Sequence, residues 1–225
     1  YRAHRYLHSF PTRRSSDLTT FNSDPGAIWV AKDSPYKTLK DLVEAARKSP
    51  ETITVAASNP GSITRFGTQL LEKNANVRFK LVSQSGGESA GPTMVAGGHV
   101  DAAQAAVVTA LSLYQAGLIR PLGVMDEKRI PAFPEIPTYK EQGYDVSISN
   151  YRQILAPKGT PKEVMDALYA AFKKAAESEK FQKFMNESGS VPLAWTPAKS
   201  KEFLAEQDEM FKKMIGELGL YKEYK

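Results

Sequence analysis

Hydrophobic positions along most of this chain alternate between short apolar runs and stripes spaced three or four residues apart. Short runs bounded by glycine, proline or asparagine are typical of buried strands, and spaced stripes are typical of amphipathic helices. From Thr19 onward the two patterns follow one another, which predicts strands and helices in alternation. Such an order is typical of an α/β fold with a mostly parallel sheet, whose loops gather at the carboxyl edge where open α/β sheets bind ligands.

The first half of the chain contains five predicted strands and four predicted helices. The strands are expected over residues 27–31, 53–57, 77–83, 99–106 and 119–125. The helices are expected from Thr38, from Ser62 to about residue 74, before Gly97, and over 107–116. Thr38 and Asp41 have the spacing of a capping box, so the first of these helices has a well-defined start.

The pattern changes after residue 125. Residues 129–137 contain three prolines and are expected to form a fixed surface excursion, followed by a short helix that Thr138 and Glu141 cap. Residues 144–157 read as an extended strand that leaves one lobe for another. Helices are then expected from Thr160-Pro161 to about 177, over 178–186 and after Thr196-Pro197, with apolar stripes that predict core packing.

The stretch 53–66, ITVAASNPGSITRF, combines a buried strand, a polar turn over 58–61 and a helix capped by Ser62. A loop of this kind places unpaired N–H groups and the positive end of a helix dipole together, which favours a carboxylate or a phosphate. An ordinary crossover turn has the same pattern, and this single loop favours that reading. A second polar loop, 84–89, also follows a strand and precedes a helix, which strengthens the case for a site.

Composition and charge narrow the function classes. The chain has 225 residues, of which 41% are hydrophobic and 24% charged, as in an ordinary globular protein. It has no cysteine, which excludes disulfides, thiol catalysis and cysteine metal sites, and no apolar window long enough to span a membrane. The net charge is +5, but residues 1–18 carry +3 of it, so the remainder has only +2 and no nucleic-acid footprint.

Residues 1–18 have no helical or strand periodicity and no apolar secretion-signal core. Residues 8–18, HSFPTRRSSDL, resemble the conceptual translation of a common DNA-sequencing adapter. The segment 1–18 is therefore expected to be a non-native tail, and the alternative is a genuine disordered basic tail. If the tail is non-native, the natural protein began further upstream and this chain is a fragment.

Residues 116–143, AGLIRPLGVMDEKRIPAFPEIPTYKEQG, resemble the signature of the tripartite tricarboxylate transporter substrate-binding proteins, the Bug family of extracytoplasmic solute receptors. The matching positions are Ala116, Gly117, Arg120, Leu122, Val124, Arg129, Pro131, Pro134, Ile136, Pro137, Thr138, Glu141 and Gly143. Further segments resemble the family in the same order along the chain, at residues 25–42, 61–62, 100–101 and 156–161. The resemblance therefore covers residues 24–220.

The resemblance implies a type II periplasmic-binding-protein-like α/β fold, with two lobes joined by crossing strands. Residues 19–147 would form the second, ligand-binding lobe with the strand that leads into it. Residues 148–225 would return to a first lobe that lacks its N-terminal half. Members of the family close around a small carboxylate, grip it with loop amides and ordered waters, and present it to a membrane permease.

The expected function is therefore that of an extracytoplasmic solute receptor, periplasmic or on the cell surface, whose signal segment is not in this chain. It would capture a small carboxylate and deliver it to permease subunits. No enzymatic activity, cofactor, metal, nucleic acid or direct membrane span is expected. The resemblance places the ligand contacts in the two polar loops, at Ser58, Asn59, Gly61, Ser62, Arg65, Ser85, Gly86 and Gly87.

Several positions depart from the family pattern, which often has Gly-Ser at residues 56–57, histidine at Arg65, Tyr-Lys at 84–85 and aspartate at Ala105. Arg65, three residues after the helix cap, could pair with a ligand carboxylate in place of the family lysine, or it could be a solvated helix arginine. Glu88 and Asp101 could bind a ligand amine, although structural capping is the commoner use of such acids.

The family's first-lobe strand and its Pro-Gly-Gly type loop have no counterpart in this sequence. The isolated chain is therefore expected to be poorly stable and to bind no carboxylate tightly. Two other classes compete with the receptor. An enzyme is disfavoured because His99 is the one histidine outside the doubtful tail and no catalytic motif is present. The ligand-sensing domain of a transcription regulator can share the fold, and only upstream sequence would discriminate it.

Overall fold

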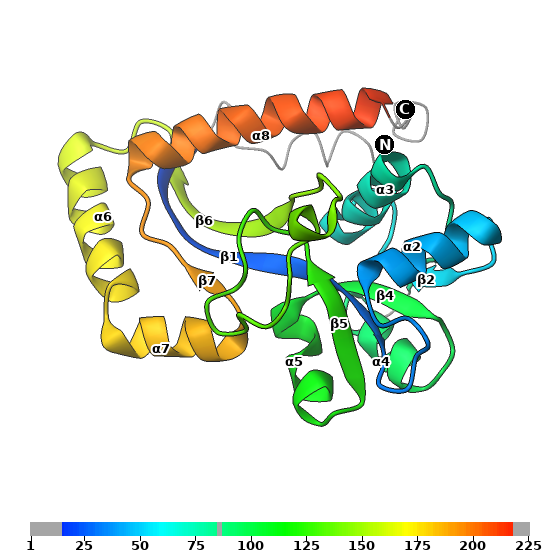
Figure 1. Ribbon diagram of the computed structural model, residues 1–225. Helices are drawn as coiled ribbons and strands as arrows, with labels where there is room; N and C mark the ends of the chain where they lie inside the picture. The colour runs from blue at the N-terminus through cyan, green and yellow to red at the C-terminus, as the bar shows by residue number, and fades with distance from the viewer. Residues whose placement is uncertain (1–14, 85–86, 218–225) are drawn as a thin grey trace. The chain divides into compact units, whose positions relative to one another are not determined.

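A computed structural model describes residues 15–84 and 87–217 of the chain (Figure 1). The backbone divides into two units. Unit 1 contains the described parts of 1–22, 151–183 and 192–225, and unit 2 contains 23–150 and 184–191. The expected lobe boundaries at 18/19 and 147/148 stay predictions.

The sheet of unit 2 mixes parallel and antiparallel strands. β1 (Ser15–Ala31), β2 (Thr54–Ala56), β3 (Lys80–Val82), β4 (Ala102–Ala106) and β5 (Ile119–Val124) lie in the order β3-β2-β4-β1-β5. β2 pairs in parallel with β3 and β4, whereas β1 runs antiparallel to β4 and β5. The expectation of a mostly parallel sheet is therefore wrong for β1, because an apolar pattern identifies a strand but carries no information about its direction.

Four helices connect these strands, namely α2 (Leu39–Lys48), α3 (Ile63–Ala75), α4 (Ala90–Ala96) and α5 (Val107–Gln115). The predicted capping box of Thr38 and Asp41 is confirmed, as is the Ser62 cap of α3. β3 is shorter than predicted because the N–H groups of Val77 and Phe79 bond to the backbone and side chain of Glu72 instead of entering the ladder.

The core of unit 2 is built mainly from small residues on the sheet and larger ones around them. Ala56, Ala103 and Ala105 are fully buried, and Trp29 packs among them with no exposed surface. The Trp29 indole donates a hydrogen bond of 3.1 Å to the carbonyl of Ala105, so its polar atom is satisfied inside the core. Because the alanine side chains of the sheet are small, residues of α4 and α5 pack directly against them.

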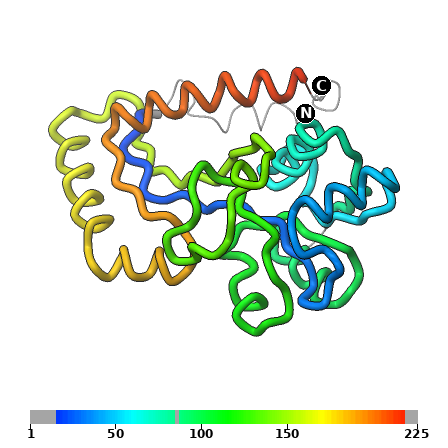
Figure 2. The backbone as a smooth tube through the Cα atoms, in the orientation of Figure 1, coloured from blue at the N-terminus to red at the C-terminus, as the bar shows by residue number. Residues whose placement is uncertain are grey.

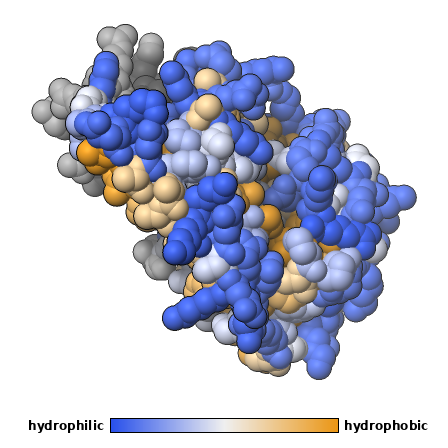
Figure 3. All heavy atoms as spheres, turned by 90° about the vertical axis from the view of Figure 1, so that its left-hand side faces the viewer, coloured by the Kyte–Doolittle hydropathy of each residue, from blue (hydrophilic) through white to orange (hydrophobic). Residues whose placement is uncertain are grey.

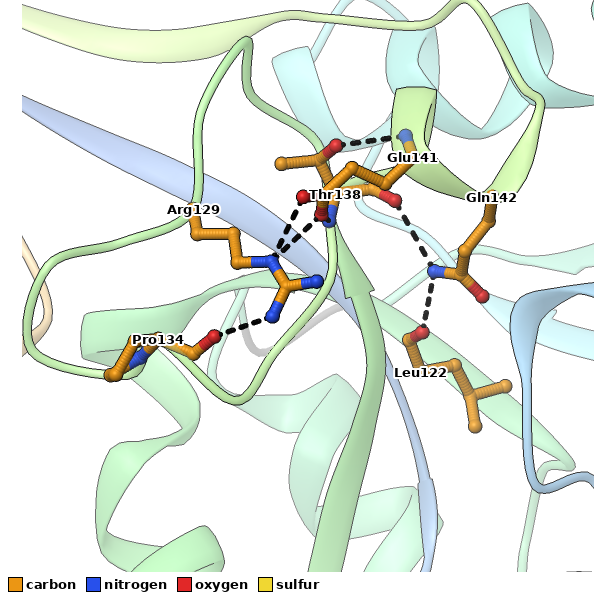
Figure 4. A network of polar contacts seen from close by, with 6 residues as sticks. All are labelled: Leu122, Arg129, Pro134, Thr138, Glu141 and Gln142. Carbon is orange, nitrogen blue, oxygen red and sulfur yellow. Dashed lines mark hydrogen bonds and ion pairs between the residues drawn. The ribbon is translucent and has the colours of Figure 1, made fainter.

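The proline-rich excursion after β5 is irregular, as predicted, and Figure 2 shows this part of the backbone, in green, as loops. Arg129 holds it by donating from Nε to both carboxylate oxygens of Glu141, at 3.0 and 2.9 Å, and from Nη1 to the carbonyl of Pro134 (Figure 4). Thr138 and Glu141 exchange the two predicted hydrogen bonds, from each backbone N–H to the other side chain, but Tyr139 takes the cap position of the short 3-10 helix η1 (Lys140–Gln142). The signature residues in this network therefore fix a loop.

Unit 1 contains α6 (Lys162–Ala176) and α8 (Pro197–Glu217), while β6 (Ser149–Pro157), α7 (Glu179–Ser188) and β7 (Val191–Pro192) have residues in both units. β6 and β7 both pair with β1. The Thr20 backbone N–H and hydroxyl lie 2.9 and 3.0 Å from the hydroxyl of Ser200. The expected cap at Thr160 is wrong by one residue, because Pro161 takes the cap position and the Thr160 hydroxyl donates to the carbonyl of Pro157.

The start of β1 corrects the expectation that residues 1–18 carry no structure. The strand begins at Ser15, and Leu18 is only 1% exposed. Ladder hydrogen bonds do not depend on side-chain identity, so a short segment of any origin can extend a strand whose partners are in place. Residues 1–14 lie outside the described residues, and the proposed origin of 8–18 stays a prediction.

The apolar stripe of α6 is exposed within the described residues, contrary to its predicted core role. Val164, Leu168 and Phe172 are 44%, 39% and 37% exposed. They are spaced four residues apart and so share one face of the helix. Figure 3, which views the molecule from the side of α6, shows hydrophobic side chains at the surface among charged ones.

Candidate ligand-binding edge

The carboxyl ends of β2, β3 and β4 meet at one edge of the sheet in unit 2. Ala56 is in register with both Val82 and Ala103, so β2 and β3 end level, and β4 continues three residues further to Ala106. Their exits are the loop 57–62, the loop 83–89 and the start of α5. The two polar loops that the sequence singles out are therefore neighbours in space, at the edge where the alternation pattern predicts a site.

The first loop presents the amino end of α3. The Ser62 hydroxyl accepts the N–H of Arg65 at 3.2 Å, and the Ser62 N–H donates to the carbonyl of Asn59 at 3.1 Å. Gly61 has φ of 87°, a left-handed conformation that residues other than glycine rarely adopt. The loop thus turns sharply and directs the first turn of a thirteen-residue helix, with its partial positive charge, toward this edge.

The second loop is described only in part, since Ser85 and Gly86 lie outside the described residues. Gly87 is exposed with φ of 77°. Glu88 accepts the backbone N–H of Ala106 through its carboxylate, and so joins this loop to the start of α5. Glu88 therefore has a structural contact, which is the commoner of the two uses considered for it.

Two side chains at this edge are buried without a hydrogen-bond partner among the described residues. They are Ser58, whose hydroxyl oxygen is buried, and Gln84, which is 3% exposed and has neither amide atom bonded. The Ala57 N–H donates to the carbonyl of Val82, so the pairing of β2 and β3 extends by one hydrogen bond, and Ser58 and Gln84 follow it in the two adjacent loops. Gln84 is not among the predicted site residues because glutamine is usually exposed, and its place in the second polar loop is the one signal that the sequence offers.

Arg65 extends from α3 toward the end of β3. Its Nη1 donates to the hydroxyl of Ser83 at 3.3 Å, and the side chain is half-buried. It also lines a groove of about 480 Å³, together with Glu51, Gln69, Glu72, Arg78, Phe79, Lys80 and Leu81. Burial raises the pKa of Glu72, and the charges of Arg78 and Arg65 oppose that rise. The arginine therefore has a partner at the end of β3, beside the second loop, and its contact with a ligand stays a prediction.

Asp101 lies at the opposite edge of the sheet. Its carboxylate accepts the N–H and the hydroxyl of Thr54 at 2.7 and 2.6 Å, which ties the start of β4 to the start of β2. The Asp101 carboxylate therefore has a structural capping role, and it lies at the amino ends of β2 and β4, away from the candidate site at their carboxyl ends. His99 precedes Asp101 and also lies on the amino side of β4.

Asp126 is an acid at the carboxyl end of β5, which runs antiparallel to β1 and therefore ends at the same edge as β4. Its carboxylate accepts the N–H of Glu127 at 2.6 Å and the hydroxyl of Ser149 at 3.0 Å. Burial raises the pKa of Asp126, and these two hydrogen bonds oppose the rise.

Within the described residues, no cluster of histidine and acidic side chains could hold a metal ion. No helix in the same part of the chain is both long enough and apolar enough to cross a membrane. The edge offers backbone N–H groups, hydroxyls, the Gln84 carboxamide and the Arg65 guanidinium. Such groups suit a small polar anion.

Comparison with known proteins gives a family match over residues 4–220, to the tripartite tricarboxylate transporter family receptor. A relative, the UPF0065 protein in the gbd 5' region of Cupriavidus necator, is 29% identical over 195 residues, which are 86% of this chain and 58% of the relative. The chain spans about three fifths of the length of the curated relatives it matches.

Solved structures share the fold. R. palustris Rpa4515 with adipate has a TM-score of 0.82 at 24% identity, over 92% of this chain and 69% of that protein. The periplasmic binding protein BugD has a TM-score of 0.78 at 23% identity, over 91% and 69%. These similarities confirm the predicted α/β class of the periplasmic-binding-protein type.

Proposed function

Because the chain belongs to the tripartite tricarboxylate transporter receptor family, we propose that it is an extracytoplasmic solute receptor that captures a small carboxylate. In this proposal it delivers the carboxylate to a tripartite tricarboxylate-type membrane permease, from the periplasm or the cell surface. The family is one of receptors and not of enzymes, as the sequence predicts. The structure of R. palustris Rpa4515 with adipate, which has the same fold, supports a carboxylate as the ligand class.

The observation that carries the proposal is the meeting of two polar loops with a helix start at one sheet edge. The backbone N–H groups of Asn59 and Gly61, with the Ser62 hydroxyl, would hold one carboxylate group, and the Ser62 N–H would join them by leaving the carbonyl of Asn59. Three or four such hydrogen bonds to a charged acceptor contribute about 1.5–3 kcal/mol each. In the second loop, Ser85, Gly86 and Gly87 are proposed to complete the grip.

Arg65 is proposed to add a positive charge to this grip. Its guanidinium already reaches Ser83, at the exit of β3, so a small rotation of the side chain would bring it to the second loop. A charged hydrogen bond from arginine to a carboxylate is stronger than one between neutral groups. Loss of Arg65 is therefore expected to weaken binding by about tenfold or more.

The test of this proposal has to detect weak binding as well as tight binding. We would record amide resonances of ¹⁵N-labelled chain while adding adipate to high millimolar concentration. The expected result is a saturable shift at Gly61, Ser62 and Gly87. Arg65→Ala should raise the dissociation constant, whereas Arg78→Ala should not, since Arg78 lines the same groove but is 72% exposed.

Two outcomes count against parts of this proposal. If adipate and other small carboxylates move none of the three loop amides, the edge is not a carboxylate site in this chain. If the loop amides move equally in the wild type and Arg65→Ala, Arg65 is a helix arginine bonded to Ser83 and is not part of the site.

A further inference from the structure

Ser58 and Gln84 have three polar atoms without a hydrogen-bond partner in the part of the chain that the structure describes, at the ends of adjacent parallel strands. The atoms are the Ser58 hydroxyl oxygen and both amide atoms of Gln84, and each of them is buried. A buried polar group without a partner costs about 1–3 kcal/mol, so folded proteins leave few of them. Unpaired groups that gather at one point of a candidate site indicate a partner that comes from outside the chain.

The Gln84 carboxamide is held in place by its surroundings. A Cβ on Gly91, in the first turn of α4, would lie 2.6 Å from Gln84 Nε2 and 3.2 Å from both Gln84 Cδ and the Ala103 Cβ. The amide therefore lies against the bare Cα of Gly91 and beside a methyl group of β4. A side chain larger than hydrogen at position 91 would displace it, so the glycine keeps this space for the amide.

The chemistry of this space is neutral. A carboxamide offers N–H donors on one atom and an acceptor on the other, and a serine hydroxyl can do either. The one ionisable side chain in the loop 83–89 is that of Glu88, an acid already bonded to the N–H of Ala106. A carboxylate beside Gln84 would accept from Nε2 but could not donate to Oε1, and its negative charge would face that oxygen.

We propose that Gln84 is a specificity-determining residue that, with Ser58, binds a neutral hydrogen-bonding group of the ligand. This inference rests on the proposed function and narrows it. The ligand is a carboxylate whose other end carries a carboxamide or a hydroxyl in place of a second carboxylate. Either group can donate to Oε1 and accept from Nε2 together, which satisfies all three unpaired atoms. A site built to bond such a group discriminates strongly against an analogue that cannot complete the bonds.

Two probes of equal length test this specificity, namely adipate and its monoamide, adipamate. We would titrate each into the ¹⁵N-labelled full chain and follow the Gly61 and Ser62 amides and the Gln84 side-chain NH₂ signal. Adipamate is expected to bind about tenfold or more tightly than adipate, as a gained pair of buried hydrogen bonds requires. The Gln84 NH₂ signal should shift with adipamate, and this readout does not need a variant.

Gln84→Met keeps the length of the side chain and removes its hydrogen bonds. We expect this variant to bind the two probes with equal affinity. Gln69→Leu is the matched control, because Gln69 is a half-buried glutamine on α3 that lines the groove beside Arg65. The control should keep the preference for adipamate.

The outcomes separate the two proposals. If the Gly61 and Ser62 amides respond to both probes equally while the Gln84 signal stays fixed, the specificity role is overturned and the carboxylate site stands. An unchanged affinity ratio in Gln84→Met would also overturn it, and an ordered water would then be the partner of the three atoms. If neither probe moves Gly61 or Ser62, the proposed function fails and this inference falls with it.

Discussion

A methyl group added to Gly91 would lie 2.6 Å from the amide nitrogen of Gln84, so the two residues share one space at the start of α4. Gly91→Ala should gain helix propensity worth about 0.5–1 kcal/mol, but it must also push the Gln84 amide aside. We expect the change to cost less in a Gln84→Ala background than in the wild type, with a coupling of about 0.5–3 kcal/mol. Urea unfolding of the two single variants and the double variant measures it.

The matched cycle pairs Gly91→Ala with Gln69→Ala. No atom of Gln69 is among those nearest to a Cβ at position 91. The changes in unfolding free energy caused by Gly91→Ala and Gln69→Ala should therefore add without coupling. Additive free energies in the Gln84 cycle as well would mean that Gln84 moves away at no cost, and the fixed placement of its amide would be wrong.

The carboxyl of Asp126 gives unit 2 a pH dependence with a defined sign. Burial raises its pKa in the folded protein above the value in the unfolded chain, so the folded state favours the protonated form. The contribution of Asp126 is fully present below the unfolded pKa of about 4 and is lost as the pH rises through the folded pKa. Asp126→Asn should therefore raise the melting temperature at pH 7 and leave it unchanged near pH 3.

Asparagine suits this test because it can still accept the Glu127 N–H, and its own NH₂ can donate to the Ser149 oxygen. Asp33→Asn is the control for the loss of one negative charge, since Asp33 is exposed. A melting temperature that falls in Asp126→Asn at pH 7 would show that the ionised carboxylate is stabilising, against the stated direction of its pKa.

Local features of the fold could be predicted from the sequence, because the residues that cause them are close together in the chain. Thr38 with Asp41 and Ser62 with the Arg65 N–H are contacts over three residues, and both helix starts are confirmed. The direction of β1 and its start at Ser15 depend on partner strands far away in the sequence, and no local pattern encodes them.

The candidate site shows the same division. The loop 57–62 was predicted, because a strand end, a glycine turn and a serine cap are all local signals. The burial of Gln84 could not be predicted from the sequence, because it depends on Gly91 and Ala103, which only the fold brings next to the side chain. Position 84 is also a departure from the family pattern, so the resemblance could not assign its role.

The Arg129–Glu141 network predicts an order of stabilities. Glu141 pairs with Arg129 and also accepts the N–H of Thr138, so Glu141→Ala loses two kinds of contact. Arg129→Ala loses the ion pair and the bond to the Pro134 carbonyl. We expect the melting temperature to fall most in Glu141→Ala, because it leaves the N–H of the buried Thr138 without its acceptor. It should fall less in Arg129→Ala, because a carbonyl tolerates the loss of a donor better than a buried N–H tolerates the loss of its acceptor.

Glu127→Ala is the control for this order, because Glu127 makes an exposed ion pair with Lys140, and such pairs contribute little. The Thr138 N–H, and then Arg129, lower the pKa of Glu141. Its contribution is therefore present above the unfolded pKa and is lost as the pH falls through the lower folded pKa. Equal melting temperatures for Glu141→Ala and Glu127→Ala at neutral pH would contradict the network's role in holding the excursion.

The exposed row on α6 predicts which apolar side chains of unit 1 can be changed without loss of stability. Leu168→Lys should alter the free energy of unfolding by less than about 0.5 kcal/mol, because 39% of Leu168 is already exposed. It should also reduce the binding of an apolar dye and raise solubility, since it breaks a contiguous apolar face. Chemical denaturation and dye fluorescence at equal protein concentration measure the two effects.

Leu204 on α8 is the matched control, because it is only 9% exposed in the same unit. Leu204→Ala should cost about 2–5 kcal/mol, as the truncation of a buried leucine does. A loss of similar size in Leu168→Lys would mean that the α6 face is packed within this chain. A small loss, together with weaker dye binding, is the result expected of an apolar face that is exposed in this chain.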